Sequence, residues 1–220
     1  MSAKETVKIG FLGSSAPSSP HHDSFKRFIP KDIDFTFMRE SGVKTSLYDA
    51  KGRVAPLITQ SRLLIDANGW SGLIISGAPK EALNPGMWEE VSAALNVPVA
   101  LALRSSVAAL KALGVKRILL MTPVDDQLKK MYRDYLSGFG IESYYPPQIL
   151  KAHTDAQKLT SRDVEAMKHK SSVPGAATCA RGVNSLPHSC TLIFWLPNLN
   201  AKRSSVGVRK VVILMPSTSV

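Results

Sequence analysis

The sequence predicts an α/β protein made of two similar, doubly wound parallel-sheet halves. Short apolar runs alternate with amphipathic stretches as far as Glu165, as in strands that crossover helices bury on both faces. Residues 7–14 and 115–122 resemble each other in type, and each is a strand-like run that ends in a hydroxyl residue. Residues 166–220 contain none of the 17 acidic residues, which separates them from the rest of the chain.

Six apolar runs are strand candidates, because each is short, apolar and bounded by polar, proline or glycine residues. In chain order they are Val7–Leu12, Ile33–Met38, Gly72–Ser76, Val97–Leu101, Arg117–Met121 and Ile141–Tyr145.

Between the strand candidates, apolar residues recur at helical spacing and predict helices. One helix has an apolar face made of Leu57, Ile58, Leu64 and Ile65, with Gln60, Arg62 and Asp66 expected in water. A second has Val107, Leu110 and Leu113 at helical spacing and ends at Gly114, a residue that suits a left-handed C-terminal cap.

A third helix is expected to open at Thr122, with threonine as its N-cap, Pro123 in the first turn and Asp125 close behind. Its apolar positions share one face: Val124, Leu128, Met131, Tyr135 and Leu136. Its start follows a strand, so its free N–H groups could bind a carboxylate or phosphate. The alternative is an ordinary, well-capped crossover helix.

These elements suggest three segments. Residues 1–108 form an N-terminal α/β half, residues 109–168 begin a C-terminal half, and residues 169–220 are a basic, acid-free tail. Two halves of this kind would bring their strand ends to a shared ligand site.

The charge of the chain is +11, of which +7 comes from the tail. Its basic residues are scattered and no nucleic-acid motif accompanies them, so nucleic-acid binding is not expected. No signal-like segment precedes Val7, and no apolar run is long enough to span a membrane, so we expect a cytoplasmic protein with no membrane partner. With two cysteines, Cys179 and Cys190, a disulfide framework is not expected.

Two segments, by their order and spacing along the chain, resemble a known superfamily. The run from Val97 to Pro123 is similar to the central segment of the aspartate/glutamate racemase superfamily, in its branch of maleate cis-trans isomerases and arylmalonate decarboxylases. Residues 72–79, followed by 84–88, look like the first active-site loop of that branch and the helix after it. The resemblance covers about residues 5–165.

The resemblance implies a small carboxylate or dicarboxylate substrate, no organic cofactor and no metal. Such enzymes stabilise a carbanion or enediolate with preorganised donors, while cysteines move protons or add to the substrate. The expected substrate-binding residues are Ser14, Ser15, Ser76, Gly77, Ala78 and Thr122. Ser76 would donate its hydroxyl, and Gly77 and Ala78 their backbone N–H groups.

The loops depart from the family pattern in three places. The first loop, Ser76-Gly77-Ala78-Pro79, lacks the cysteine that many members carry there. Pro123-Val124 stands where many members have a tyrosine, and Ser14-Ser15 stands where an asparagine is common. Cys190, near His188, is the candidate for the second cysteine, and Cys179 lies in the same region. His21 and His22 are expected to be solvated residues of a Ser/Pro-rich loop rather than metal ligands.

From about residue 168 the family pattern stops. One hypothesis is a shift of reading frame at this point, and the alternative is a divergent basic tail with its own role. If the tail is not native, residues 115–145 should keep exposed sheet edges, which invite aggregation.

The sequence therefore favours a cofactor-independent isomerase or racemase. A homo-oligomer is compatible with this interpretation. Within the same class the alternative is decarboxylation of a substituted malonate, which the missing first cysteine favours. A second class is an inactive carboxylate-binding remnant with a frame-shifted C-terminus. A third is a Rossmann-like nucleotide binder, suggested weakly by Gly10 and Gly13.

Overall fold

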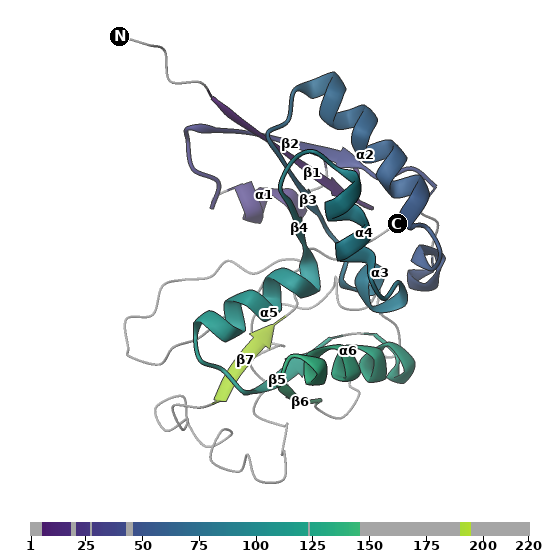
Figure 1. Cartoon of the computed structure of the whole chain (residues 1–220). Helices are drawn as coiled ribbons and strands as arrows, with labels where there is room; N and C mark the ends of the chain where they lie inside the picture. The colour runs from purple at the N-terminus through teal and green to yellow at the C-terminus, as the bar shows by residue number, and fades with distance from the viewer. Residues whose placement is uncertain are drawn as a thin grey trace. The chain divides into compact units, whose positions relative to one another are not determined.

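The computed structural model of the chain describes residues 6–18, 21–26, 28–42, 46–122, 124–145 and 190–194. These residues divide into two units, and the boundary falls between Ser105 and Ser106. Each unit contains a parallel β-sheet with helices packed on it (Figure 1). The predicted α/β class with parallel sheets is confirmed.

The first unit contains a four-stranded sheet. Its strands β1 (Val7–Gly13), β2 (Ile33–Arg39), β3 (Gly72–Ile75) and β4 (Val99–Leu101) lie in the order β2-β1-β3-β4. All their pairings are parallel. The four carboxyl ends therefore meet at one edge of the sheet, which is where open α/β proteins bind ligands.

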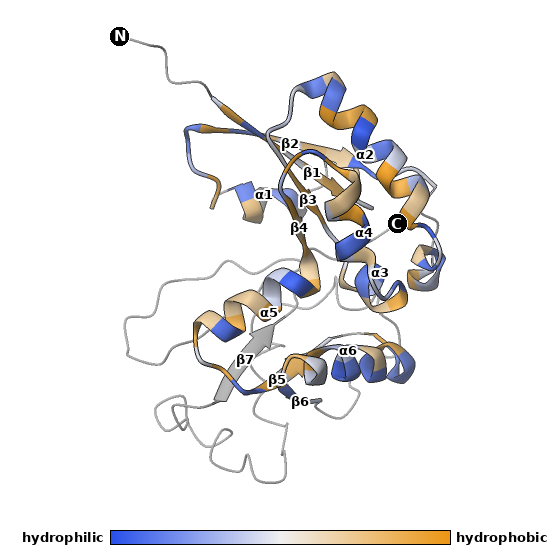
Figure 2. Ribbon diagram, viewed as in Figure 1, coloured by the Kyte–Doolittle hydropathy of each residue, from blue (hydrophilic) through white to orange (hydrophobic). Residues whose placement is uncertain are grey.

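Helices α2 (Val54–Asn68) and α4 (Met87–Ala94) contribute to a core with one face of this sheet. The strand residues of this core are Leu12, Leu73, Ile75 and Leu101, all almost fully buried. Figure 2 shows that β3 and β4 are largely hydrophobic, whereas α2 carries both hydrophobic and hydrophilic residues. Burial of these side chains is the main stabilising contribution to this layer.

A glycine lets an aromatic ring reach this core. A β-carbon on Gly10 of β1 would lie only 2.1 Å from the ring of Trp70, which is itself buried. Trp70 follows the end of α2, where Gly69 adopts a left-handed conformation with φ +63°. Any side chain at Gly10 would displace the indole from the strand.

Helix α1 (His21–Lys26) supplies an aromatic layer against β1 and β2. The ring of His22 stacks on Phe37 with centroids 4.1 Å apart and contacts Phe11 edge-on. Only 3% of His22 is exposed, and its Nδ1 lies 3.2 Å from the carbonyl oxygen of Pro17. The prediction that His22 is a solvated loop residue is wrong, because the imidazole packs between strand-borne phenylalanine rings.

Two further short elements, besides α1, were not predicted from periodicity. They are a 3₁₀ helix η1 (Leu47–Ala50) and helix α3 (Ala78–Leu83). Ser46 and Asp49 form a reciprocal capping box at the start of η1. Asn84, just after α3, donates to the carbonyl oxygens of Ala50 and Lys80 and so ties the two elements together.

The second unit contains a three-stranded parallel sheet in the order β6-β5-β7. The strands are β5 (Arg117–Met121), β6 (Glu142–Tyr144) and β7 (Cys190–Phe194). Helices α5 (Ala102–Ala112) and α6 (Asp126–Gly138) carry buried apolar side chains, among them Val107, Leu110, Leu128 and Leu136.

Strand β7 comes from the acid-free tail. It pairs with β5 along all five residues, from Cys190 opposite Arg117 to Phe194 opposite Met121. The tail therefore supplies a partner strand on this side of β5, and the open edge expected for a chain without a native tail stays a prediction. The remaining tail residues, Cys179 among them, lie outside the described part of the chain.

The ends of α5 and α6 test two predicted caps. Gly114 follows α5 in the left-handed conformation, with φ +67°, as predicted. The N-cap of α6 is Asp125 and not Thr122: the Asp125 carboxylate accepts from the Leu128 N–H at 2.9 Å. The carboxylate accepts from a backbone N–H that has no partner within the helix. Its negative charge also interacts more favourably with the positive end of the helix dipole than a hydroxyl does. The capped crossover helix is thus the interpretation that the geometry favours.

Candidate functional site

The carboxyl edge of the four-stranded sheet gathers polar residues from successive strands. Ser14 and Ser15 follow β1, Glu40 follows β2 and Ser76 follows β3. All four side chains belong to buried residues, although they stand at the end of a sheet where loops normally meet water. Buried polar groups at a strand edge need partners, so the partners of each show what the edge can do.

The ends of β1 and β3 lie against each other. The Ser76 N–H donates to the carbonyl of Leu12 at 2.9 Å, which extends the pairing by one residue beyond β3. A β-carbon on Gly13 would lie 2.6 Å from Ser76 Oγ, so the Ser76 hydroxyl lies directly beside the Gly13 backbone. The structure therefore brings the predicted residues Ser14 and Ser76 to adjacent strand ends.

The Ser14 hydroxyl is buried without a hydrogen-bond partner among the described residues. Only 2% of Ser14 is exposed. A buried hydroxyl with no acceptor or donor costs free energy, about 1–3 kcal/mol for an unsatisfied polar group. Such a group is explained when a ligand or an ordered water supplies the missing partner.

The first loop places Gly77 in a conformation that suits glycine, with φ +106° and ψ +93°. Gly77 is followed by α3, whose first residue Ala78 is buried. An L-residue with a side chain would be strained at this φ, so the sharp turn from β3 into α3 depends on glycine. The loop is the one that the sequence analysis assigned to carboxylate binding.

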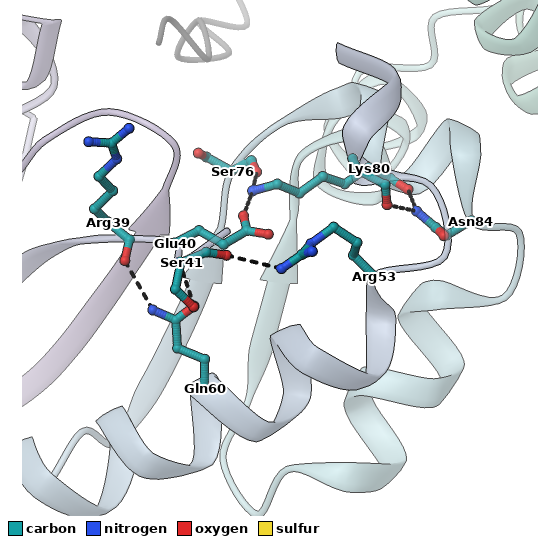
Figure 3. Close-up of polar contacts among 9 residues, drawn as sticks. Arg39, Glu40, Ser41, Arg53, Gln60, Ser76, Lys80 and Asn84 are labelled. Carbon is teal, nitrogen blue, oxygen red and sulfur yellow. Dashed lines mark hydrogen bonds and ion pairs between the residues drawn. The ribbon is translucent and has the colours of Figure 1, made fainter. Parts of the chain in front are cut away.

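A buried ion pair lies beside this loop. Lys80 of α3 pairs with Glu40 at the end of β2, and the side chains are 6% and 4% exposed. Lys80 Nζ also donates to the carbonyl oxygen of Ser76 at 2.8 Å. Figure 3 shows the lysine extended between Glu40 and Ser76. Burial lowers the pKa of Lys80, and the adjacent Glu40 carboxylate opposes that shift.

Glu40 is fixed through its backbone as well. Its N–H donates to the carbonyl of Gly13 at 2.7 Å. On the outer side, Gln60 of α2 accepts from the Ser41 N–H at 2.9 Å and donates to the carbonyl of Arg39 at 3.0 Å (Figure 3). The segment after β2 is thus held from both sides.

A second buried carboxylate, that of Glu81, lies at the end of β4. The Glu81 carboxylate accepts hydrogen bonds from the backbone N–H groups of Leu103 and Arg104, in the first turn of α5. This helix end is where a ligand anion could bind. Glu81 occupies it from within the chain, whereas the Ser14 hydroxyl has no hydrogen-bond partner among the described residues.

In the second unit, the two predicted site residues lie at opposite edges of the sheet. Thr122 follows the carboxyl end of β5 and is half-buried. Cys190 begins β7 and pairs with Arg117, the first residue of β5. Five residue steps separate Arg117 from Thr122, a length of about 17 Å along the strand. The register therefore does not bring Cys190 and Thr122 together.

Sequence reasoning missed Glu40, Lys80 and Glu81. Each is a charged residue that periodicity would assign to the surface, and each pairs with a residue more than twenty positions away or on another element. One local signal existed: Lys80-Glu81 directly follows a strand, a glycine and a proline. Among the described residues, no group of three or more histidine, cysteine, aspartate or glutamate residues could hold a metal ion. No helix in the described ranges is long and apolar enough to cross a membrane.

The open α/β fold is shared with solved enzymes. Unliganded arylmalonate decarboxylase matches with a TM-score of 0.58 at 16% identity, covering 86% of this chain and 77% of that chain. Maleate isomerase Iso from Pseudomonas putida S16 matches with a TM-score of 0.55 at 14% identity, covering 86% and 77%. No family model and no curated protein sequence matches the chain.

A third structure is a mutant of Nocardia farcinica maleate cis-trans isomerase with a covalently bound succinylcysteine intermediate. It matches with a TM-score of 0.57 at 16% identity, covering 85% of this chain and 76% of that chain. At these identities the likeness establishes the fold. The resemblance that the sequence predicted is therefore confirmed at the level of the fold.

Proposed function

We propose that the chain is a cofactor-independent isomerase or racemase of the aspartate/glutamate racemase superfamily that acts on a small carboxylate or dicarboxylate. The single observation that carries this proposal is the Ser14 hydroxyl at the end of β1, which is buried without a hydrogen-bond partner among the described residues; the end of the neighbouring strand β3 carries Ser76. The shared fold with maleate isomerase and arylmalonate decarboxylase supports it.

The chemistry follows from what such an edge offers. Removing a proton beside a carboxylate leaves an enediolate, whose negative charge spreads onto the carboxylate oxygens. Hydroxyl groups already fixed by the fold, such as Ser14 and Ser76, can donate to those oxygens without reorganising. The N–H groups of Gly77 and Ala78 are further candidate donors.

The proton-transfer group is a separate question. The resemblance assigns this role to cysteine, and Cys190 is the candidate in the sequence. Because β7 begins with Cys190 at the amino edge of its sheet, the proposal rests on the serine residues and does not depend on this thiol.

Decarboxylation of a substituted malonate is the alternative reaction. The bond to the departing carboxylate breaks, carbon dioxide leaves, and the electron pair stays as an enediolate that takes up one proton. The loop from Ser76 to Pro79 contains no cysteine, which favours a reaction with proton delivery from one side only.

One experiment separates these reactions from simple binding. The purified full-length protein is incubated with maleate, aspartate, glutamate or an arylmalonate in deuterated water, and NMR follows isomerisation, exchange and decarboxylation. We expect turnover that Ser14→Ala and Ser76→Ala reduce. Folded protein that binds a carboxylate without turnover would replace the enzyme proposal by the carboxylate-binding remnant. Activity that survives both Cys179→Ala and Cys190→Ala would remove the thiol mechanism.

A further inference from the structure

The buried pair of Lys80 and Glu40 connects the ends of three strands. Lys80 Nζ contacts the Glu40 carboxylate after β2 and donates to the Ser76 carbonyl after β3. The Glu40 N–H in turn donates to the Gly13 carbonyl at the end of β1. These contacts hold the strand ends that carry the serine hydroxyls.

Stability alone is a weak reason for a buried ion pair. Desolvation of both charges offsets much of their attraction, and an apolar pair of similar volume is often equally stable. Helix α3 is also anchored independently of the lysine side chain, because Asn84 donates to the carbonyls of Ala50 and Lys80 and accepts from the Gly52 N–H. The Lys80 ammonium is therefore not needed to attach α3 to the unit.

The ammonium does fix the orientation of one peptide group. Gly77 has φ +106° and ψ +93°, and glycine by itself accepts many other conformations. The Lys80 hydrogen bond fixes the direction of the Ser76 carbonyl. In a trans peptide the N–H points opposite to the C=O, so the Gly77 N–H is directed away from Lys80.

We propose that Lys80, held by Glu40, is a positioning residue: it orients the Ser76–Gly77 peptide so that the Gly77 N–H can donate to the substrate carboxylate. This inference rests on the proposed carboxylate site. Lys80 does not touch the substrate in this role and acts through the peptide group that it holds.

The test uses the ¹⁵N-labelled full-length protein, with malonate and maleate as probes and the Gly77 amide resonance as readout. The main variant is Lys80→Met/Glu40→Gln, which leaves no uncompensated buried charge. Lys80→Arg is the conservative variant, because a guanidinium can donate to both acceptors. The matched control is Lys129→Met: Lys129 is also buried, at 8% exposure against 5% for Lys80, and is paired with Asp126 in the second unit.

We expect the double variant to shift the ligand-free Gly77 resonance and to weaken malonate binding about tenfold or more, the usual loss for a misplaced hydrogen bond to a charged group. Lys80→Arg should retain binding, and Lys129→Met should leave both readouts unchanged. If the double variant does not fold, the apolar pair Lys80→Met/Glu40→Met is measured in the same way.

A folded double variant with an unshifted Gly77 resonance and unchanged malonate affinity would overturn the inference. If the original chain binds neither probe, the carboxylate proposal fails. The ligand-free Gly77 resonance still decides whether Lys80 positions the peptide, so the two failures can be told apart.

Discussion

Ser76 Oγ occupies the space beside Gly13 that a side chain would need, since a β-carbon there would lie 2.6 Å from this oxygen. We therefore expect Gly13→Ala to push the Ser76 hydroxyl away from the end of β1. The variant should lose stability by about 1–3 kcal/mol, as in other overpacked sites, and should bind malonate more weakly. Thermal unfolding and calorimetric titration measure the two effects.

Gly138→Ala is the control for this substitution. Gly138 is the last residue of α6, and a β-carbon on it meets nothing within 4 Å. This change should leave malonate binding intact and raise stability by up to about 1 kcal/mol, because alanine favours a helix more than glycine does. If Gly13→Ala and Gly138→Ala had the same stability and the same malonate affinity, displacement of the Ser76 hydroxyl would have no effect on either quantity.

The pair of Lys80 and Glu40 predicts strongly non-additive effects on stability. Lys80→Met alone leaves a buried carboxylate without its partner, so the free energy of unfolding should fall by about 3–5 kcal/mol. Lys80→Met/Glu40→Gln removes both charges and should cost clearly less than the single change. Chemical denaturation of both variants and of Glu40→Gln completes the double-mutant cycle. Additive losses would contradict a direct pairing.

Much of the fold could be predicted from the sequence, and the charged part of the site could not. Strands buried on both faces are plain apolar runs, so β1, β2 and β5 were placed to within one residue. Helices α1 and α3 have only six residues each, too few for a helical period to show. Lys80 and Glu40 are forty positions apart, and no local pattern links them. Their burial follows from α3 folding over the end of β2, which only the tertiary structure reveals.

The lowered pKa of Lys80 predicts a dependence of stability on pH. Between that lowered value and 10.5, the unfolded chain binds more protons at this residue than the folded chain does. The free energy of unfolding contributed by this residue therefore rises with pH across that window. The comparison is between the original chain and Lys80→Met/Glu40→Gln, from neutral pH to 10.5. We expect the stability difference between them to shift in favour of the original chain as the pH rises; an opposite trend would mean that the ion pair raises the lysine pKa.

Tyr145 offers a second test with the reverse sign. Burial raises its pKa to about 12 from 10.0, and its hydroxyl donates to the Lys129 carbonyl at 2.9 Å. The raised value favours the folded chain, and this contribution is lost as the pH rises above 10.0 through the folded pKa. Tyr145→Phe should lower stability at neutral pH by about 1 kcal/mol through the lost hydrogen bond. It should also remove the last step of a tyrosinate absorbance titration, a step that should persist in Tyr48→Phe.

Glu81 predicts where an anion can and cannot bind at this edge of the sheet. Its carboxylate accepts from the N–H groups of Leu103 and Arg104 and so fills the N-terminus of α5. Glu81→Gln keeps the volume but turns an amide group toward those donors, and one of its two polar atoms can no longer accept. We expect a loss of about 1–3 kcal/mol in the free energy of unfolding. Glu90→Gln, on the exposed side of α4, should cost almost nothing.

The smaller variant Glu81→Ala should do more than destabilise α5. It leaves the first-turn N–H groups without their internal carboxylate, so an added anion such as sulfate or malonate should bind there and restore part of the lost stability. We therefore expect the unfolding temperature of Glu81→Ala to rise with malonate concentration more steeply than that of Glu81→Ala/Ser14→Ala. If Ser14→Ala makes no difference to the steepness, malonate binds at α5 alone, and the serine hydroxyl at the end of β1 is not a carboxylate site.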